Sequence, residues 1–218
     1  ELQMTAVTLD RPNGSVILAR VEELIRNFPK RAEPYHLLLG GIDQRNESEF
    51  RKTLEGIAGS KEAPDQVKQV AAGHLRRLDL KGKALDITFS ALDGRKVDLG
   101  AMQGKIVLVD FWATWCGPCV VELPRVKAVY DRFHERGFEI VGISFDSNRS
   151  ALEKFVQERN MPWPQYFDGK AWQNEIGRKF AVTAIPTMWL IDRDGKVIDL
   201  QARQDLEAKV EQLMRQSP

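Results

Sequence analysis

Hydrophobic positions in the first 80 residues recur with the spacing of amphipathic helices. Apolar residues lie three or four positions apart in four successive stretches, residues 15–28, 32–43, 47–58 and 64–80. Pro29 and Gly59 directly follow two of these stretches, and both residue types commonly stop helices. We therefore expect a small all-helical N-terminal domain over residues 1–81, whose role the sequence leaves open.

Beyond Gly82 the pattern changes to apolar strands that alternate with helices. The expected strands are residues 84–89, 96–99, 106–111, 138–145, 165–167, 187–192 and 196–200, and the expected helices are residues 117–136, 150–160, 172–180 and 203–216. Asp93-Gly94 and Asp194-Gly195 predict hairpin turns. The almost unbroken apolar run at 106–111 is typical of a strand buried on both faces. Residues 82–218 are therefore predicted to form an α/β domain with a central mixed sheet flanked by helices.

Composition and charge exclude several classes of protein. The chain is 43% hydrophobic and 29% charged, which is enough apolar content for a folded core. Its 32 basic and 31 acidic residues leave a net charge of +1, so no broad surface for nucleic acid or anionic membrane is expected. The chain begins at Glu1, and we expect a mature or trimmed form from which any leader or anchor has been removed.

The chain has two cysteines, Cys116 and Cys119, within the pentapeptide Trp-Cys-Gly-Pro-Cys. Two cysteines placed at random would be three positions apart only about 1% of the time, so the spacing is informative. Cys116 is expected just before a helix, where free backbone N–H groups and the helix dipole stabilise a thiolate. Cys119 lies one turn further, within disulfide reach. The pattern predicts an exposed attacking Cys116 and a shielded resolving Cys119.

The residues around this pair resemble the thioredoxin superfamily, and more closely its TlpA/ResA-like thiol–disulfide oxidoreductase branch. The resemblance runs over roughly residues 84–201, through the segments 111–119, 122–124, 141–144, 184–187 and 192–196. It implies a thioredoxin-like fold and a thiol–disulfide oxidoreductase, and the Gly117-Pro118 dipeptide favours a reductant over a strong oxidant. Residues 1–80 resemble no comparable family.

The resemblance also implies a substrate groove. Pro186 is expected to form a cis peptide bond with Ile185 and to face the cysteines, whereas the alternative is an ordinary trans proline at the start of a strand. Trp115, Gly117 and Pro118 are expected on the exposed rim of the same groove. Residues 199–204 read Asp-Leu-Gln-Ala-Arg-Gln, where thioredoxin-like chains often have a glycine.

Two carboxylic acids are candidate catalytic residues. Asp110 interrupts the apolar run at 106–111, and the matching aspartate of thioredoxins relays the proton of the resolving cysteine. Burial would raise the pKa of this carboxyl, although the residue could instead only accept hydrogen bonds at a strand end. Many TlpA/ResA-like chains have asparagine there, so Asp110 is a departure. Glu122 matches an active-site carboxylate of ResA-like proteins, but it could equally be solvated or pair with Arg125.

Rival interpretations remain open for the cysteine pair. A structural disulfide or half of a metal site is one, although His36, His74 and His134 are scattered along the chain. A thiol peroxidase of the alkyl hydroperoxide reductase/thiol-specific antioxidant type is a second, but its motif would need other residues than Val109 and Ala113 before Cys116. A non-enzymatic binding module on a thioredoxin-like scaffold, for copper or a partner protein, is a third.

The favoured hypothesis is a disulfide reductant that works through a mixed disulfide and needs neither an organic cofactor nor a metal. Its expected partners are a protein disulfide or dithiol and a separate electron-donor protein. The resemblance suggests an extracytoplasmic location in a bacterial cell envelope. The helical domain could bind a client, a membrane partner or a second subunit, or it could be a structural cap on the sheet.

Overall fold

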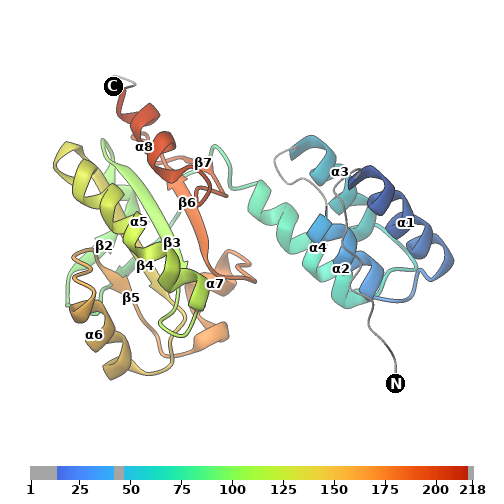
Figure 1. Ribbon diagram of the computed structural model, residues 1–218, viewed down its shortest axis with the longest axis horizontal. Coiled ribbons are helices and arrows are strands. Elements are labelled where there is room, and N and C mark those ends of the chain that lie inside the picture. Colours follow the sequence, from blue (N-terminus) through green and yellow to red (C-terminus); the bar gives the residue numbers. More distant parts are fainter. Residues whose placement is uncertain (1–13, 42–46, 216–218) are drawn as a thin grey trace. The chain divides into compact units, whose positions relative to one another are not determined.

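A computed structural model describes residues 14–41 and 47–215 of the chain (Figure 1). The chain divides into two compact units, Glu1–Leu75 and Arg76–Pro218, which we call the helical unit and the sheet unit. The division falls within a helix, a few residues before the expected boundary at 81/82, which stays a prediction.

The described part of the helical unit contains α1 (Gly14–Asn27), α2 (Glu33–Gly41), α3 (Glu47–Ala58) and most of α4 (Asp65–Leu78), whose last turn already belongs to the sheet unit. The second expected helix ended at Asp43, which lies outside the described residues. Each of α3 and α4 buries one apolar face, with Leu54 and Val67 fully covered. The expected all-helical N-terminal region is therefore confirmed.

The sheet unit contains a five-stranded mixed sheet with the strand order β5-β4-β3-β6-β7. Its strands are β3 (Ile106–Trp112), β4 (Phe138–Ser144), β5 (Gln165–Tyr166), β6 (Thr187–Ile191) and β7 (Val197–Asp199), and its helices are α5 (Gly117–Phe133), α6 (Arg149–Glu158), α7 (Glu175–Lys179) and α8 (Leu206–Arg215). β3 is buried along its whole length, as its apolar run predicts. In Figure 1, α5 lies across one face of the sheet. The predicted central mixed sheet flanked by helices is confirmed.

The register of the sheet brings three chain segments to one edge. β3 and β4 are parallel, so their carboxyl ends meet, with Trp112 opposite Ser144. β6 runs antiparallel to β3 and begins at Thr187, opposite Phe111. The chain that leaves β3 towards α5 therefore lies beside the chain that enters β6 and the chain that leaves β4.

Some expected elements are shorter than predicted. The first hairpin reduces to β1 (Thr88–Ser90) and β2 (Lys96–Asp98), a separate two-stranded sheet. The structure also contains the short 3₁₀ helices η1 (Leu99–Met102), η2 (His134–Arg136) and η3 (Ala171–Gln173). The expected helix at 172–180 is interrupted, because the Asn174 side chain accepts the Gly177 N–H and starts α7 after η3. The helices in the described part of the chain are too short or too polar to cross a bilayer.

Candidate active site

The two cysteines form a disulfide at the beginning of α5. Cys116 is the N-cap residue, with extended backbone angles, and its Sγ accepts the N–H of Cys119 at 3.3 Å. The Cα atoms of the pair are 5.2 Å apart. Pro118 lies in the first turn, where its missing N–H does no harm. The predicted placement, with Cys116 before the helix and Cys119 one turn inside, is confirmed.

The predicted difference in exposure between the cysteines is wrong for this disulfide form. Cys116 is 4% exposed and Cys119 is 6% exposed. The reason is the N-cap geometry, which turns the Cys116 sulfur inward to accept the Cys119 N–H and to bond with the second sulfur. A partner that reacts with this pair must therefore press closely against the surrounding surface.

The exposure of the expected groove residues can be read from the structure. Trp115 is 53% exposed, and Gly117 and Pro118 are exposed beside it. The Ile185–Pro186 peptide bond is cis, so the alternative of a trans proline is wrong. Both residues are partly exposed, and they precede β6 at the sheet edge where β3 ends.

Asp110 is buried in the middle of the sheet. It pairs in register with Gly142 on β4 and Met188 on β6, and the residue is only 5% exposed. Within the described part of the chain, its Oδ1 atom has no hydrogen-bond partner. Burial raises the pKa of Asp110 to about 7, and the negative charge of Glu122 adds to the rise. This carboxyl can therefore exchange a proton near neutral pH.

Glu122 lies on α5, one turn after Cys119, and its side chain is only 16% exposed. One carboxylate oxygen pairs with Arg125 Nε at 3.0 Å, and the other pairs with Arg203 Nε. The guanidinium of Arg125 also donates to the carbonyl oxygen of Arg203. The Arg125 partnership is thus confirmed, and a freely solvated Glu122 is wrong. Sequence reasoning missed Arg203, which comes from the segment that lacks the expected glycine.

A buried carboxylate holds the loop that carries the cysteines. Asp146 is 3% exposed and accepts hydrogen bonds from the Thr114 N–H at 3.1 Å and from the Thr114 hydroxyl at 2.5 Å. The Ser144 hydroxyl donates to the same carboxylate at 2.8 Å. Asn174 secures this strand end by donating to the Ser144 carbonyl oxygen at 2.9 Å. The signal for Asp146 in the sequence is a polar residue directly after the apolar strand expected at 138–145.

A second tryptophan joins the rim of the site. The rings of Trp115 and Trp172 are 6.0 Å apart, centroid to centroid, and Trp172 is 45% exposed. Trp115 Nε1 donates to the Phe145 carbonyl oxygen at 3.3 Å, and the Phe145 ring meets Trp172 edge-on at 5.3 Å. Sequence reasoning placed Trp172 only at the start of a helix, because its neighbour Trp115 is 57 positions away.

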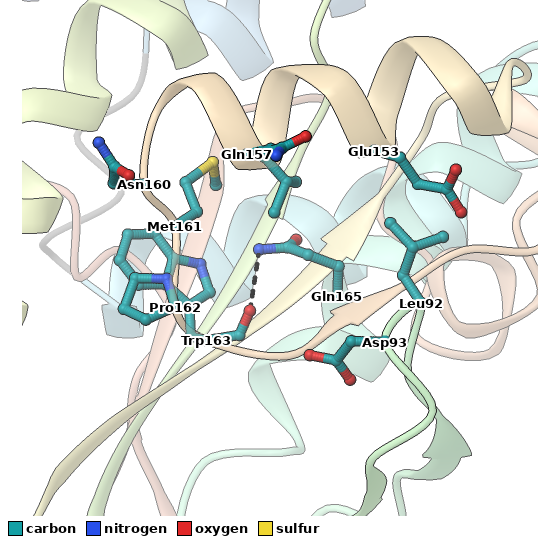
Figure 2. Close-up of a pocket in the computed structure, with 10 residues that line it drawn as sticks. Leu92, Asp93, Glu153, Gln157, Asn160, Met161, Pro162, Trp163 and Gln165 are labelled. Atoms are coloured by element: carbon teal, nitrogen blue, oxygen red, sulfur yellow. Dashed lines mark hydrogen bonds between the residues drawn. The ribbon is translucent and has the colours of Figure 1, made fainter.

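A pocket of about 470 Å³ lies between α6, the turn of the first hairpin and the segment before β5. Figure 2 shows Gln165 among the lining residues, with its Nε2 directed at the Trp163 carbonyl oxygen, 3.4 Å away. The Gln165 Oε1 atom accepts the Nε1–H of Trp112 at 2.9 Å. A Cβ on Gly142 would lie 2.0 Å from that oxygen, so this glycine is required for the contact. The buried amide therefore fixes the ring of Trp112, four positions before Cys116.

The histidines do not gather into a metal site. The residues that the structure describes contain no group of three or more His, Cys, Asp or Glu side chains placed to hold a metal ion. His74 packs edge-on against Phe50 in the helical unit. His134 stacks on Tyr130 with the ring centroids 4.4 Å apart.

Sequence comparisons place most of the sheet unit among known redox proteins. The profile of the Redoxin family matches residues 80–214. A thiol-disulfide oxidoreductase ResA from Bacillus thuringiensis subsp. konkukian is 32% identical over 143 residues, which are 65% of this chain and 81% of that protein. A ResA from Bacillus anthracis is 31% identical over 141 residues, covering 63% of this chain and 80% of that protein.

Solved structures agree with this assignment. The thioredoxin domain of a thiol-disulfide oxidoreductase from Bacteroides vulgatus superposes with a TM-score of 0.56 and 31% identity, covering 62% of this chain and 98% of that structure. A structure from Chlorobium tepidum, described as a thiol:disulfide interchange protein DsbE, gives a TM-score of 0.55 and 29% identity over 62% of this chain and 97% of its own.

Proposed function

The chain belongs to the Redoxin family and is a ResA-like thiol–disulfide oxidoreductase, and from this premise we propose that it reduces disulfides in partner proteins. The observation that carries this proposal is the Cys116–Cys119 disulfide at the N-terminus of α5. The cis bond before Pro186 and the buried Asp110 support it.

The first step is attack by the reduced enzyme. The Cys116 thiolate is stabilised by the N–H of Cys119 and by the positive end of the α5 dipole. Its Sγ forms a bond with one sulfur of the substrate disulfide while the substrate S–S bond breaks. The other substrate sulfur leaves as a thiolate and takes a proton from water. The product is a mixed disulfide between Cys116 and the substrate.

The second step releases the substrate. Asp110, whose pKa is about 7, accepts the proton of Cys119, and the resulting thiolate attacks the Cys116 sulfur. The mixed disulfide breaks, the Cys116–Cys119 disulfide forms, and the second substrate sulfur leaves as a thiolate that takes a proton from water. Burial is the main cause of the high pKa of Asp110, and the Glu122 carboxylate, which two arginines hold in place, adds to it. A separate dithiol protein then supplies two electrons to restore the enzyme.

The binding residues proposed for the substrate are Trp115, Gly117, Pro118, Ile185 and Pro186. The proposal is supported by their exposure and by the sheet register, which brings the start of β6 beside the end of β3. The mechanism uses only cysteine and carboxylate groups and calls on no organic cofactor or metal. The resemblance to ResA supports a location outside the cytoplasm, in a bacterial cell envelope. A role for the helical unit in binding a client, a membrane partner or a second subunit remains a hypothesis, beside that of a structural cap.

The reduction potential of the Cys116–Cys119 couple tests the direction of electron flow. We expect a value near the roughly −270 mV of thioredoxin, measured by equilibration with glutathione or dithiothreitol buffers. The reduced protein should also cleave 2-hydroxyethyl disulfide, and the Cys116→Ser variant should not. A potential near about −120 mV would instead identify an oxidant of the DsbA kind.

A further inference from the structure

Two of the exposed large apolar side chains of the sheet unit touch each other beside the redox disulfide. Among the described residues of this unit, Trp115, Val121 and Trp172 are the large apolar side chains that stand out into solvent. Trp115 directly precedes Cys116, and its ring contacts that of Trp172. Adjacent exposed rings leave an apolar surface in contact with water, which is unfavourable unless a partner covers it.

The geometry presents carbon rather than polar atoms on this surface. The indole N–H of Trp115 is occupied by the carbonyl oxygen of the buried Phe145. The ring of Phe145 supports Trp172 from below, edge-on. The polar end of Trp115 is therefore directed at the protein, and the exposed part of its indole offers mainly its apolar ring.

The loop that carries Trp172 is firmly held. The Asp168 carboxylate accepts the N–H groups of Lys170 and Glu175, at 2.9 and 2.8 Å. Ala171 has a φ of 47°, a left-handed conformation that is unfavourable for alanine and that persists only when the surroundings enforce it. Trp172 is thus fixed before any partner arrives, which lowers the entropy lost on binding.

We propose that Trp115 and Trp172 form an apolar platform for an aromatic or large aliphatic side chain that flanks the reacting cysteine of a partner protein. Because Cys116 is only 4% exposed, the partner's cysteine must approach closely, and its neighbours then meet Trp115 first and Trp172 next. Lys170 and Glu175, the charged residues on either side of Trp172, pair with each other, so an uncharged side chain fits best. This inference rests on the proposed function and makes Trp172 a specificity-determining residue.

The test compares three substrates of the reduced full-length protein. Two are short disulfide peptides that differ only in having Phe or Ser beside the reacting cysteine, and the third is 2-hydroxyethyl disulfide, which has no flanking residue. The wild-type protein should prefer the Phe peptide over the Ser peptide. Trp172→Ala should lower kcat/KM for the Phe peptide ~10-fold and leave the other two substrates nearly unchanged. Trp172→Phe should keep most of the preference, because it retains an aromatic ring.

Val121→Ala is the matched control, since it removes exposed apolar surface from α5 and alters neither ring; it should not change the preference. Trp172→Gln replaces the Ala variant if the latter does not fold. The proposal is overturned if the wild-type protein does not distinguish the two peptides, or if Trp172→Ala slows all three substrates equally. Failure of the wild-type protein to reduce 2-hydroxyethyl disulfide would overturn the proposed function itself.

Discussion

The helical unit and the sheet unit differ in what they bury. Among the side chains that the structure describes, the buried residues of the helical unit are apolar or aromatic, apart from proline and glycine, as Leu54 and Val67 illustrate. In the described ranges 14–41 and 47–215, the buried polar or charged side chains all belong to the sheet unit: Asp110, Ser144, Asp146, Gln165 and Asn174. Burying such groups is unfavourable unless each finds partners, so their position in one unit needs a reason.

The reason lies in where these five side chains act. Asp146, Ser144 and Asn174 are bonded to one another or to the loop before Cys116. Gln165 holds Trp112, four positions before Cys116. Asp110 alone keeps a buried oxygen without a partner. The sheet unit thus buries polar side chains near its redox centre, where function can require such a departure from apolar packing. The helical unit shows only the packing of a stable helical fold.

Substitution of the two cysteines should have the largest effect, because they are the reacting groups of the sheet unit. Cys119→Ser should accumulate a mixed disulfide with a model disulfide, because the resolving thiol is gone while the N-cap thiolate remains. Cys116→Ser should form far less adduct and lose turnover by about 10³-fold or more, as expected for loss of a nucleophile. Intact mass, before and after added reductant, measures the adduct that each variant forms. Faster alkylation of Cys119 than of Cys116 at neutral pH would contradict this assignment.

Asp110→Asn should have the next largest effect, on the rate of resolution. We expect resolution to slow about 100-fold, because a positioned base commonly contributes that much. The deficit should be greatest at and below pH 7, since the pKa of Asp110 is about 7 and Cys119 loses its proton unaided at higher pH. Glu122→Gln should move the pH profile to lower pH, because it removes the charge that raises this pKa. Equal turnover of Asp110→Asn and wild type from pH 6 to 8 would rule out the proton relay.

The same substitution should change the pH dependence of stability. The pKa of Asp110 is raised from 3.8 to about 7 in the folded protein, so folding favours the protonated form. Stability is therefore greatest below pH 4 with respect to this group and is lost as the pH rises through 7, by at most about 4 kcal/mol. Asp110→Asn should remove that loss, so chemical denaturation at pH 5 and pH 8 should show a smaller difference than in wild type. An unchanged difference would mean that Asp110 is not buried as a neutral acid.

The parts of the molecule that could be predicted are those whose signal is local. The apolar run at 106–111 specified β3, the Asp-Gly dipeptides marked both hairpins, and the position of Cys116 before a helix followed from the strand that precedes it. Pro186 and its cis bond came only through resemblance to a family. The continuous helix that periodicity predicted at 172–180 is wrong, because the Asn174 side chain caps a new helix inside that range.

What could not be predicted depends on loops that meet only in the folded chain. Arg203 reaches Glu122 across 81 positions, and Asp146 reaches Thr114 across 32. Neither contact can be read from the spacing of apolar and polar residues in the sequence, because each depends on the direction of a loop after its strand. The prediction that Cys116 is exposed is wrong for a related reason, since the direction of an N-cap side chain is set by the hydrogen bond that it accepts.

The smallest expected effect comes from removing the helical unit. Deletion of residues 1–80 should leave a folded protein that reduces 2-hydroxyethyl disulfide within about twofold of the full-length rate, because the buried polar groups around the cysteines all lie beyond the cut. The deletion keeps Gly82 and Lys83, whose backbones pair with Val197 on β7. It removes Leu80, which packs against the core of the sheet unit, so a chain that starts at Leu80 should be about 1 kcal/mol more stable in urea. If both shortened chains are insoluble or inert, the helices form part of the catalytic fold, and the contrast between the two units does not hold.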